Sequence, residues 1–274
     1  MKPAPFAYQR ATTTEDALAA LARAGEDARF LAGGQSLVVM LNMRLVQPKL
    51  LVDISRVEAL RGIRIIDGQI QVGAATRQAE LLAWPELTTR QPLLAEAMPW
   101  IGHVQTRSKG TVGGSIAHAD PSSELPLCLA VLGGEIVLRS TKRRRTLPAA
   151  EFQTGMLSTA RTADELLESV RFPLMPADTR YAFEEFGLRH GDFAIVAVAV
   201  AISPKGLRIG IGGVADRPAI KDFPPLSGSA LDDALNAFAW ELGGQSDQHA
   251  TARYRRELVR RLGRRAVLRA QGAQ

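Results

Sequence analysis

The chain has 274 residues, of which 46% are hydrophobic and 23% are charged, a composition typical of globular proteins and unlike that of collagen-like or disordered chains. Its formal net charge is +6, but residues 251–274 hold eight arginines against the single acid Glu257. The rest of the chain is therefore close to neutral, and a general nucleic-acid-binding surface is not indicated.

Neither a membrane span nor a secretory signal is predicted. Residues 1–6 lack the apolar core of a signal peptide, and the best apolar run, residues 193–202, is shorter than the roughly 18 residues of a spanning helix. We therefore expect a soluble, cytoplasmic protein. The one cysteine, Cys128, excludes an internal disulfide and is expected in a core. The four histidines lack ligand spacing, so no metal site is predicted.

The first 55 residues predict a β-α-β arrangement. Thr14 is expected to cap a helix that Gly25 closes. The expected strands are residues 6–8, 29–31 and 50–54, and a short helix is expected from Ser36 to about residue 43.

A second block begins near residue 57. Asp67-Gly68 is a two-residue hairpin signal, and Asp120-Pro121 is typical of a helix start, with a cap residue followed by proline. Residues 102–110 are expected to form a glycine- and basic-rich approach to the next turn. The expected strands are residues 63–66, 69–72, 135–140, 146–147 and 166–172, and the expected helices are residues 76–82 with Thr76 as the cap, 93–98 and 120–133.

The paired prolines in residues 173–178 predict a domain boundary, because they interrupt the periodicity. The last block is expected to be an antiparallel sheet followed by helices. Its expected strands are residues 181–188, 193–202 and 207–212, and its expected helices are residues 230–239 and 247–269.

The turn Ala32-Gly33-Gly34-Gln35-Ser36-Leu37, between a strand and a helix, is a candidate phosphate site. A phosphate needs backbone N–H groups that point toward it, and glycine lets the backbone approach closely. The turn Thr111-Val112-Gly113-Gly114-Ser115 follows the same reasoning and adds two hydroxyls. Each turn by itself is equally compatible with a plain structural turn. Downstream, Asp120 either caps a helix or accepts hydrogen bonds from sugar hydroxyls.

A third glycine cluster, residues 210–215, fits the G-x-G-x-x-G/A dinucleotide pattern. However, Asp216-Arg217-Pro218 follows where a helix would have to run. We interpret the cluster as a strand that ends in a turn and not as a Rossmann site.

The first two turns and their flanks carry a family resemblance. Residues 32–37 with Met43-Arg44-Leu45, and residues 111–126, resemble the two signatures of the FAD-binding medium subunit of molybdenum hydroxylases, a family that includes carbon monoxide dehydrogenase and xanthine dehydrogenase. Residues 191–194, residues 212–214 and the final helix from Tyr254 resemble its C-terminal domain.

The resemblance implies an α+β fold of the vanillyl-alcohol-oxidase (PCMH) type. Residues 1–176 would form the FAD-binding domain, with α/β lobes 1–55 and 56–176, and residues 177–274 would form a C-terminal α/β domain with an antiparallel sheet and helices. FAD would be held noncovalently.

The implied FAD-binding residues divide by the part of FAD they would contact. The two turns would bind the pyrophosphate, and Asp120 the ribose or ribityl region. Ile101 and Leu166 would lie near adenine, and Phe186 and Phe193 near the flavin. The full set is Ala32, Gly33, Gly34, Gln35, Ser36, Leu37, Ile101, Thr111, Gly113, Gly114, Ser115, Asp120, Leu166, Phe186 and Phe193, and none of them need be catalytic.

The resemblance also implies partners. A large molybdopterin subunit would carry out hydroxylation, and a small subunit with two [2Fe–2S] clusters would pass electrons to FAD and on to an acceptor, in a dimer of heterotrimers. Family members often carry lysine where Glu185 stands, which leaves the local electrostatics around the flavin open. A branch with a four-cysteine iron–sulfur loop is excluded by the single cysteine.

Two other functions compete with this one. A self-contained flavoenzyme of the same fold, resembling UDP-N-acetylenolpyruvoylglucosamine reductase, would need an acid or nucleophile in residues 177–274, where none is evident. An arginine-rich module for nucleic acid or an acidic partner would use the final helix. Residues Lys142 to Arg145 are either a solvated hairpin tip or a docking patch.

Overall fold

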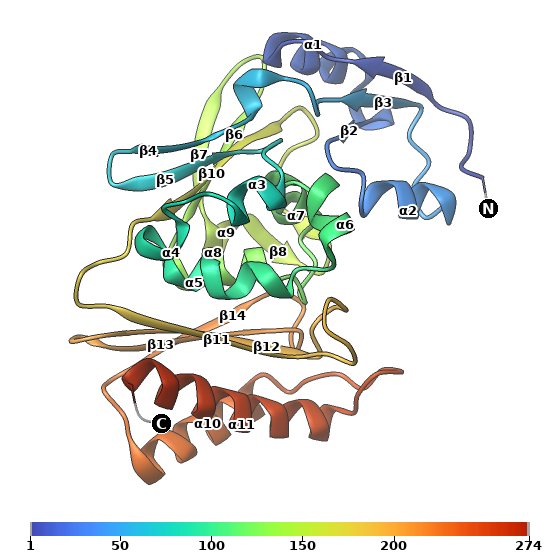
Figure 1. The fold of residues 1–274 in the computed structure, drawn as a ribbon. Coiled ribbons are helices and arrows are strands. Elements are labelled where there is room, and N and C mark those ends of the chain that lie inside the picture. The colour runs from blue at the N-terminus through green and yellow to red at the C-terminus, as the bar shows by residue number, and fades with distance from the viewer. Residues whose placement is uncertain (1, 273–274) are drawn as a thin grey trace.

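The computed structural model describes residues 2–272, and its strands form three main sheets that follow one another along the molecule (Figure 1). The strands are β1 Ala7–Arg10, β2 Ala28–Leu31, β3 Leu50–Asp53, β4 Ile63–Ile66, β5 Gln69–Gly73, β6 Glu135–Arg139, β7 Arg144–Pro148, β8 Gln153–Gly155, β9 Ser158–Thr159, β10 Leu166–Pro173, β11 Arg180–Phe186, β12 Val196–Ser203, β13 Gly206–Gly212 and β14 Ala219–Phe223.

The α-helices lie on and between these sheets. They are α1 Thr14–Ala24, α2 Leu37–Asn42, α3 Gln78–Leu82, α4 Leu87–Arg90, α5 Pro92–Ala97, α6 Val104–Lys109, α7 Val112–His118, α8 Glu124–Leu132, α9 Ala149–Phe152, α10 Gly228–Glu241 and α11 Ala252–Gln271. Three short 3-10 helices, Gly25–Asp27, Glu58–Leu60 and Met98–Trp100, complete the set in the described residues.

The N-terminal lobe is a parallel sheet of order β1-β3-β2, against which α1 packs. Thr13 caps α1, because its hydroxyl accepts from the Asp16 N–H at 3.1 Å, so the cap lies one residue before the predicted Thr14. The buried face of α1 includes Ala17, Leu18 and Leu21. The predicted β-α-β arrangement is confirmed.

The middle sheet is antiparallel, with the order β4-β5-β10-β6-β7. Asp67 and Gly68 form the β4–β5 hairpin turn, both with positive φ, 50° and 73°, as a type I′ turn requires. Side chains from this sheet and from α5, α7 and α8 form the largest core, in which Cys128 is fully buried. The prediction that Cys128 packs in a core is confirmed.

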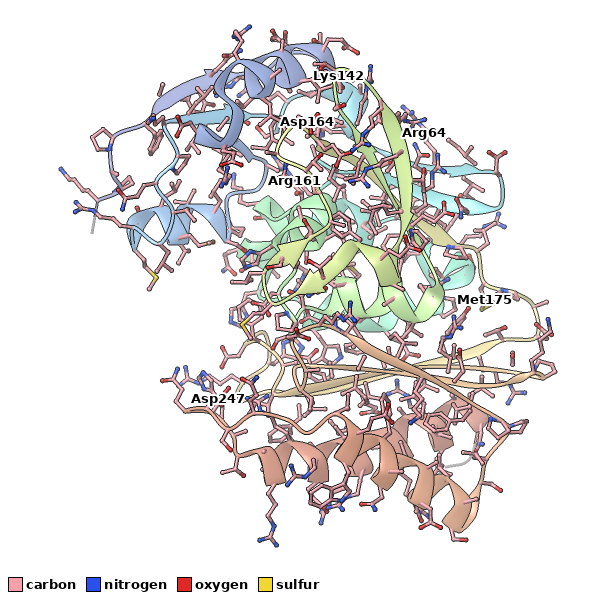
Figure 2. All side chains as sticks on the ribbon, turned by 180° about the vertical axis from the view of Figure 1, so that it is seen from behind. Arg64, Lys142, Arg161, Asp164, Met175 and Asp247 are labelled. Atoms are coloured by element: carbon pink, nitrogen blue, oxygen red, sulfur yellow. The ribbon has the colours of Figure 1, made fainter. Side chains whose placement is uncertain are left out.

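The third sheet has the order β11-β12-β13-β14 and is covered on both faces (Figure 1). Val196, Val198 and Val200 belong to the core formed with α10 and α11, whereas Ala197 and Ala199 belong to the core of the middle sheet. This alternation follows from the two-residue period of a strand. The segment that joins β10 to β11 contains Met175, which is labelled in Figure 2.

Several predicted boundaries are wrong. Asp120-Pro121 does not start a helix; α8 begins at Glu124, after a turn in which the Asp120 carboxylate accepts from the Ser122 N–H at 2.8 Å. Thr76 does not cap α3, and its hydroxyl instead donates to the Gly62 carbonyl at 3.1 Å. Residues 102–110, predicted as a glycine- and basic-rich approach to the second glycine turn, contain helix α6. The predicted strand at residues 193–202 begins only at Val196. Strand β14 and the β8–β9 pair have no counterpart among the predicted strands.

The third glycine cluster ends a strand, as predicted. Strand β13 ends at Gly212, and Gly213, with φ 80°, makes the turn and donates to the Pro121 carbonyl at 2.9 Å. The residues that follow form a turn and then β14. A Rossmann site is therefore absent from this segment, which the structure describes in full.

The arginines of α11 are largely paired within the chain. Arg255 is buried and donates to the Ile195 and Gly213 carbonyls at 2.6 and 2.7 Å. Arg265 and Arg269 bind Glu184, and Arg260, Arg261 and Arg264 also have carboxylate partners. These contacts leave little unpaired charge for nucleic acid, which weakens the arginine-module interpretation. Within residues 2–272 no helix has the length and apolar character needed to cross a bilayer.

Candidate functional site

A groove of about 1110 Å³ is lined by all three parts of the chain. The N-terminal lobe contributes residues 32–37, the middle block contributes residues 110–111, 113–115 and 117–118, and the loop before β12 contributes residues 191–193. Pockets for drug-sized ligands are about 300–1,000 Å³. This groove can therefore take a larger and extended molecule.

The first glycine turn offers unused hydrogen-bond donors to this groove. Among residues 2–272, no protein acceptor takes the backbone N–H groups of Gly33, Gly34, Gln35 and Ser36. Gly34 has a φ of 72°, and a Cβ on Gly33 would lie 2.3 Å from the Lys109 carbonyl oxygen. The close approach needs glycine, and the four free donors suit an anion.

The second glycine turn is the first turn of α7, and it differs from the first. Thr111 is the N-cap, and its hydroxyl accepts from the Gly114 N–H at 3.0 Å. The Gly113 and Ser115 N–H groups donate to the Ala74 and Thr111 carbonyls at 3.1 Å each. The expectation that Gly113 and Gly114 expose free N–H groups is therefore wrong. A Cβ on Gly113 would lie 2.6 Å from Ala74 Cα, so this glycine permits close packing.

The groove brings together most of the candidate site residues. Ala32, Gly33, Gly34, Gln35, Ser36, Leu37, Ile101, Thr111, Gly113, Gly114, Ser115, Leu166 and Phe193 all line it.

Asp120 and Phe186 are not among the lining residues. The Asp120 carboxylate is used in the turn before α8, and Phe186 packs edge-on against Tyr254 with ring centroids 6.0 Å apart. Phe193, by contrast, lines the groove and is 62% exposed.

The groove also contains polar residues that sequence reasoning missed. Gln78 lines it and has a buried Oε1 atom without a partner among the described residues. Arg29 and Arg161 line it as well, and Figure 2 labels Arg161 where the N-terminal lobe meets the middle block. Glu124, which lies inside the second signature at residues 111–126, also lines the groove. Gln78, Arg29 and Arg161 lie outside both glycine signatures, so their sequence context gave no signal.

Burial shifts the protonation of several groove residues. Burial lowers the pKa of the His118 imidazole, which favours its neutral form. Burial, together with nearby Arg29, lowers the pKa of the Arg161 guanidinium. Burial raises the pKa of Glu124 to about 7. The described residues contain no group of three or more His, Cys, Asp or Glu side chains able to hold a metal ion.

A second cavity, of about 590 Å³, adjoins the loop at residues 191–193, which also lines the groove. Met156 and Leu188 contribute apolar lining, and Asp216 and Asp247 contribute carboxylates. Figure 2 labels Asp247 at the edge of the C-terminal domain. The loop at residues 191–193 therefore separates two hollows in the surface.

The residues present fit an extended dinucleotide. Four free N–H donors lie at the first glycine turn, and two guanidinium groups line the groove. The unpaired Gln78 Oε1 atom can accept a hydrogen bond from a ligand. The exposed ring of Phe193 can cover an aromatic ring system. A pyrophosphate with an aromatic group at each end is the kind of molecule that satisfies all of these features.

Two family models match the chain. Residues 4–175 match a model described as the FAD binding domain in molybdopterin dehydrogenase, and residues 181–270 match one described as the CO dehydrogenase flavoprotein C-terminal domain. Two curated relatives align along nearly the full chain. The 6-hydroxypseudooxynicotine dehydrogenase complex subunit alpha of Paenarthrobacter nicotinovorans is 37% identical over 98% of this chain and 96% of the relative. The carbon monoxide dehydrogenase medium chain of Afipia carboxidovorans is 35% identical over 98% of each chain.

Solved structures agree with these matches. Quinoline 2-oxidoreductase from Pseudomonas putida 86 superposes with a TM-score of 0.94 at 32% identity, covering 100% of this chain and 99% of that chain. A carbon monoxide dehydrogenase from Hydrogenophaga pseudoflava superposes with a TM-score of 0.93, also at 32% identity, covering 99% of both chains.

Proposed function

We propose that this chain binds FAD in the groove between its glycine turns, because it belongs to the family of FAD-binding medium subunits of molybdopterin dehydrogenases. It is therefore the FAD-binding subunit of a heteromeric molybdenum hydroxylase. The single observation that carries this proposal is the set of four unpaired N–H groups at residues 33–36. They supply donors where an anionic pyrophosphate needs them.

The residues of the chain would hold and orient the cofactor. The first turn would bind the pyrophosphate, and the Ser115 hydroxyl, at the second turn, would add one donor. Ile101 and Leu166 would lie beside one end of FAD and Phe193 beside the other. When bound, FAD supplies the reversible electron exchange, and the protein supplies binding, orientation and electrostatics. We assign no acid–base catalyst in this chain.

We propose that the chain works between two partners, a large molybdopterin subunit and a small subunit with two [2Fe–2S] clusters, in a dimer of heterotrimers. Electrons would enter from the clusters and leave to an external acceptor. An exposed apolar patch on and after α2 supports a docking role: Val38, Val39, Met43 and Leu45 are 42%, 53%, 52% and 65% exposed. The patch directly follows the first glycine turn, so a partner docked there would lie beside the groove.

Co-expression of the chain with its neighbouring genes tests this assignment. Native mass spectrometry is expected to show a complex that contains two copies of each of three subunits. Denaturation of this complex is expected to release FAD. A chain that alone oxidises or reduces an organic substrate with NAD(P)H would instead support the self-contained flavoenzyme. A colourless chain that resists FAD and shifts DNA at moderate salt would support the arginine module.

A further inference from the structure

Two buried glutamates lie where helix α8 of the middle block packs against the C-terminal sheet. Glu124 is the first residue of α8, lines the groove and is 5% exposed. Glu185 lies on β11 and is also 5% exposed. Carboxylates are rarely buried to this degree unless a cation or several donors accompany them.

The neighbouring residues Glu184 and Glu185 have opposite surroundings, because successive side chains of a strand point to opposite faces. Glu184 faces α11, where it accepts from Arg265 Nε at 2.8 Å and from an Arg269 guanidinium nitrogen at 2.9 Å. Glu185 shares its face with Phe183, which packs in the core of the middle block. Among the described residues, the buried Oε2 of Glu185 has no hydrogen-bond partner.

The groups that face Glu185 are acidic or neutral. Helix α8 contributes Glu124 and Cys128, and α5 contributes Glu96, which is itself bound by Arg269 and by the Phe183 N–H. The paired residue on β12 is Ala197. Within residues 2–272 no cation is paired with either Glu124 or Glu185.

Burial and neighbouring negative charge favour protonation of this pair. Burial, and next the charge of Glu124, raise the pKa of Glu185 to about 9. Burial, with a smaller effect of Asp120, raises the pKa of Glu124 to about 7. Burial together with these two carboxyls also raises the pKa of the Cys128 thiol. Since the two carboxyls titrate as a coupled pair, the second charge is the costly one.

We propose that Glu124, which lines the nucleotide groove, and Glu185 form a coupled carboxyl pair that keeps one proton at neutral pH and sets the charge beside the bound cofactor. The cofactor part of this inference rests on the proposed function. Loss of the proton at higher pH adds a negative charge next to the groove. A nearby negative charge disfavours electrons added to a bound group, so the reduction potential falls.

The first test needs no cofactor and uses the pH dependence of unfolding of the full chain. A carboxyl with a raised folded-state pKa keeps a proton that the unfolded chain releases, so stability falls as pH rises. Because Glu124 also holds an extra proton below about pH 7, Glu185 alone accounts for the fall from about pH 7 to about pH 8.5, where the unfolding equilibrium changes about tenfold per pH unit. Glu185→Gln is expected to remove this pH-dependent fall. An unchanged fall in the variant would overturn the proposal.

Glu184→Gln is the matched control, because it lies on the same strand but faces the arginines of α11. It is expected to lower stability at every pH while keeping the pH-dependent fall. If Glu185→Gln does not fold, Glu124→Gln is expected to move the end of the fall in stability to lower pH, because Glu185 stays buried but loses its charged neighbour. The double variant is expected to show a flatter pH dependence of stability than either single variant, because each buried carboxyl holds a proton of its own below about pH 7. A fall that ends at the wild-type pH in Glu124→Gln would contradict the coupling.

The second test measures the reduction potential of bound FAD against pH in the purified complex. The wild type and Glu185→Gln are expected to agree at low pH and to diverge as pH rises, with the wild type more negative. Parallel curves would refute the effect on the cofactor. If the unfolding test succeeds but the chain binds no FAD, the carboxyl pair stands and the proposed function fails. If FAD binds but the unfolding curves coincide, the carboxyl pair fails.

Discussion

Replacing Gly33 with alanine is expected to weaken FAD binding while leaving the chain folded. The added Cβ would lie 2.3 Å from the Lys109 carbonyl oxygen and 2.7 Å from Gly110 Cα. Ordinary carbon contacts are about 3.5 Å or longer, so one of the two backbone segments has to move by roughly 1 Å. The turn that moves carries the four free N–H groups.

The magnitude follows from the donors. A hydrogen bond to a charged group contributes about 1.5–3 kcal/mol, and it weakens steeply beyond about 3.2 Å. Loss of one such bond lowers affinity about 10- to 150-fold. Flavin fluorescence during titration of the FAD-free chain measures this change.

The matched control is Gly210→Ala. A Cβ there would lie 2.3 Å from Val131 Cγ2, among apolar side chains that do not line the groove. This control is expected to lower the unfolding midpoint without changing FAD affinity. The reasoning is refuted if Gly33→Ala binds FAD as the wild type does, or if both variants lose affinity in proportion to their loss of stability.

Three further outcomes are expected. Arg145→Ala is expected to lower the unfolding free energy by about 3 kcal/mol, because Arg145 binds both oxygens of the fully buried Glu165. Lys142→Ala, which removes an exposed side chain of the same hairpin, is expected to leave the unfolding free energy unchanged in the same denaturant titration. The hydrogen-bond donors around Glu165 outweigh its burial and lower its pKa from 4.5 to about 2. The contribution of Arg145 to the unfolding free energy is therefore present above about pH 4.5 and disappears as the pH falls toward 2. Acid unfolding curves that coincide for wild type and variant would contradict this expectation. Val39→Asp is expected to leave the isolated chain stable but to weaken subunit assembly at least tenfold in analytical ultracentrifugation, and unchanged assembly would remove this face from the interface. Arg255→Met is expected to destabilise the chain by about 2–4 kcal/mol in urea, because the buried Ile195 carbonyl and the partly buried Gly213 carbonyl lose their donor. A smaller change would mean that water replaces the guanidinium.

Local signals in the sequence located the first glycine turn between a strand and a helix, whereas its assignment as a phosphate site needed the family resemblance, because the glycine pair by itself is equally compatible with a plain turn. The same kind of signal failed at Asp120-Pro121. An aspartate that accepts from the N–H two residues later makes a turn with the residue types of a helix cap. Helix α6, Val-Gln-Thr-Arg-Ser-Lys, lacks an apolar period, and β14 has a polar pair in its middle. Tertiary contacts, and not local pattern, fix both elements.

Some residues of the candidate site could likewise be predicted from local sequence patterns, and others could not. The candidate site residues within the two glycine signatures could be placed in the groove from the sequence, with Asp120 as the exception. Gln78, Arg29 and Arg161 reach the groove only through the packing of separate segments. The meeting of Glu124 and Glu185 depends on how a helix of one domain lies on the sheet of another, which no short sequence pattern records.

The flavin content of the purified full-length chain tests the central claim most directly. Absorbance of the cofactor released on denaturation, divided by protein concentration, gives the stoichiometry. We predict one noncovalent FAD for each chain, and a marked loss in Gly33→Ala but not in Gly210→Ala. A wild-type chain that contains no flavin and takes up none from excess FAD would contradict the account.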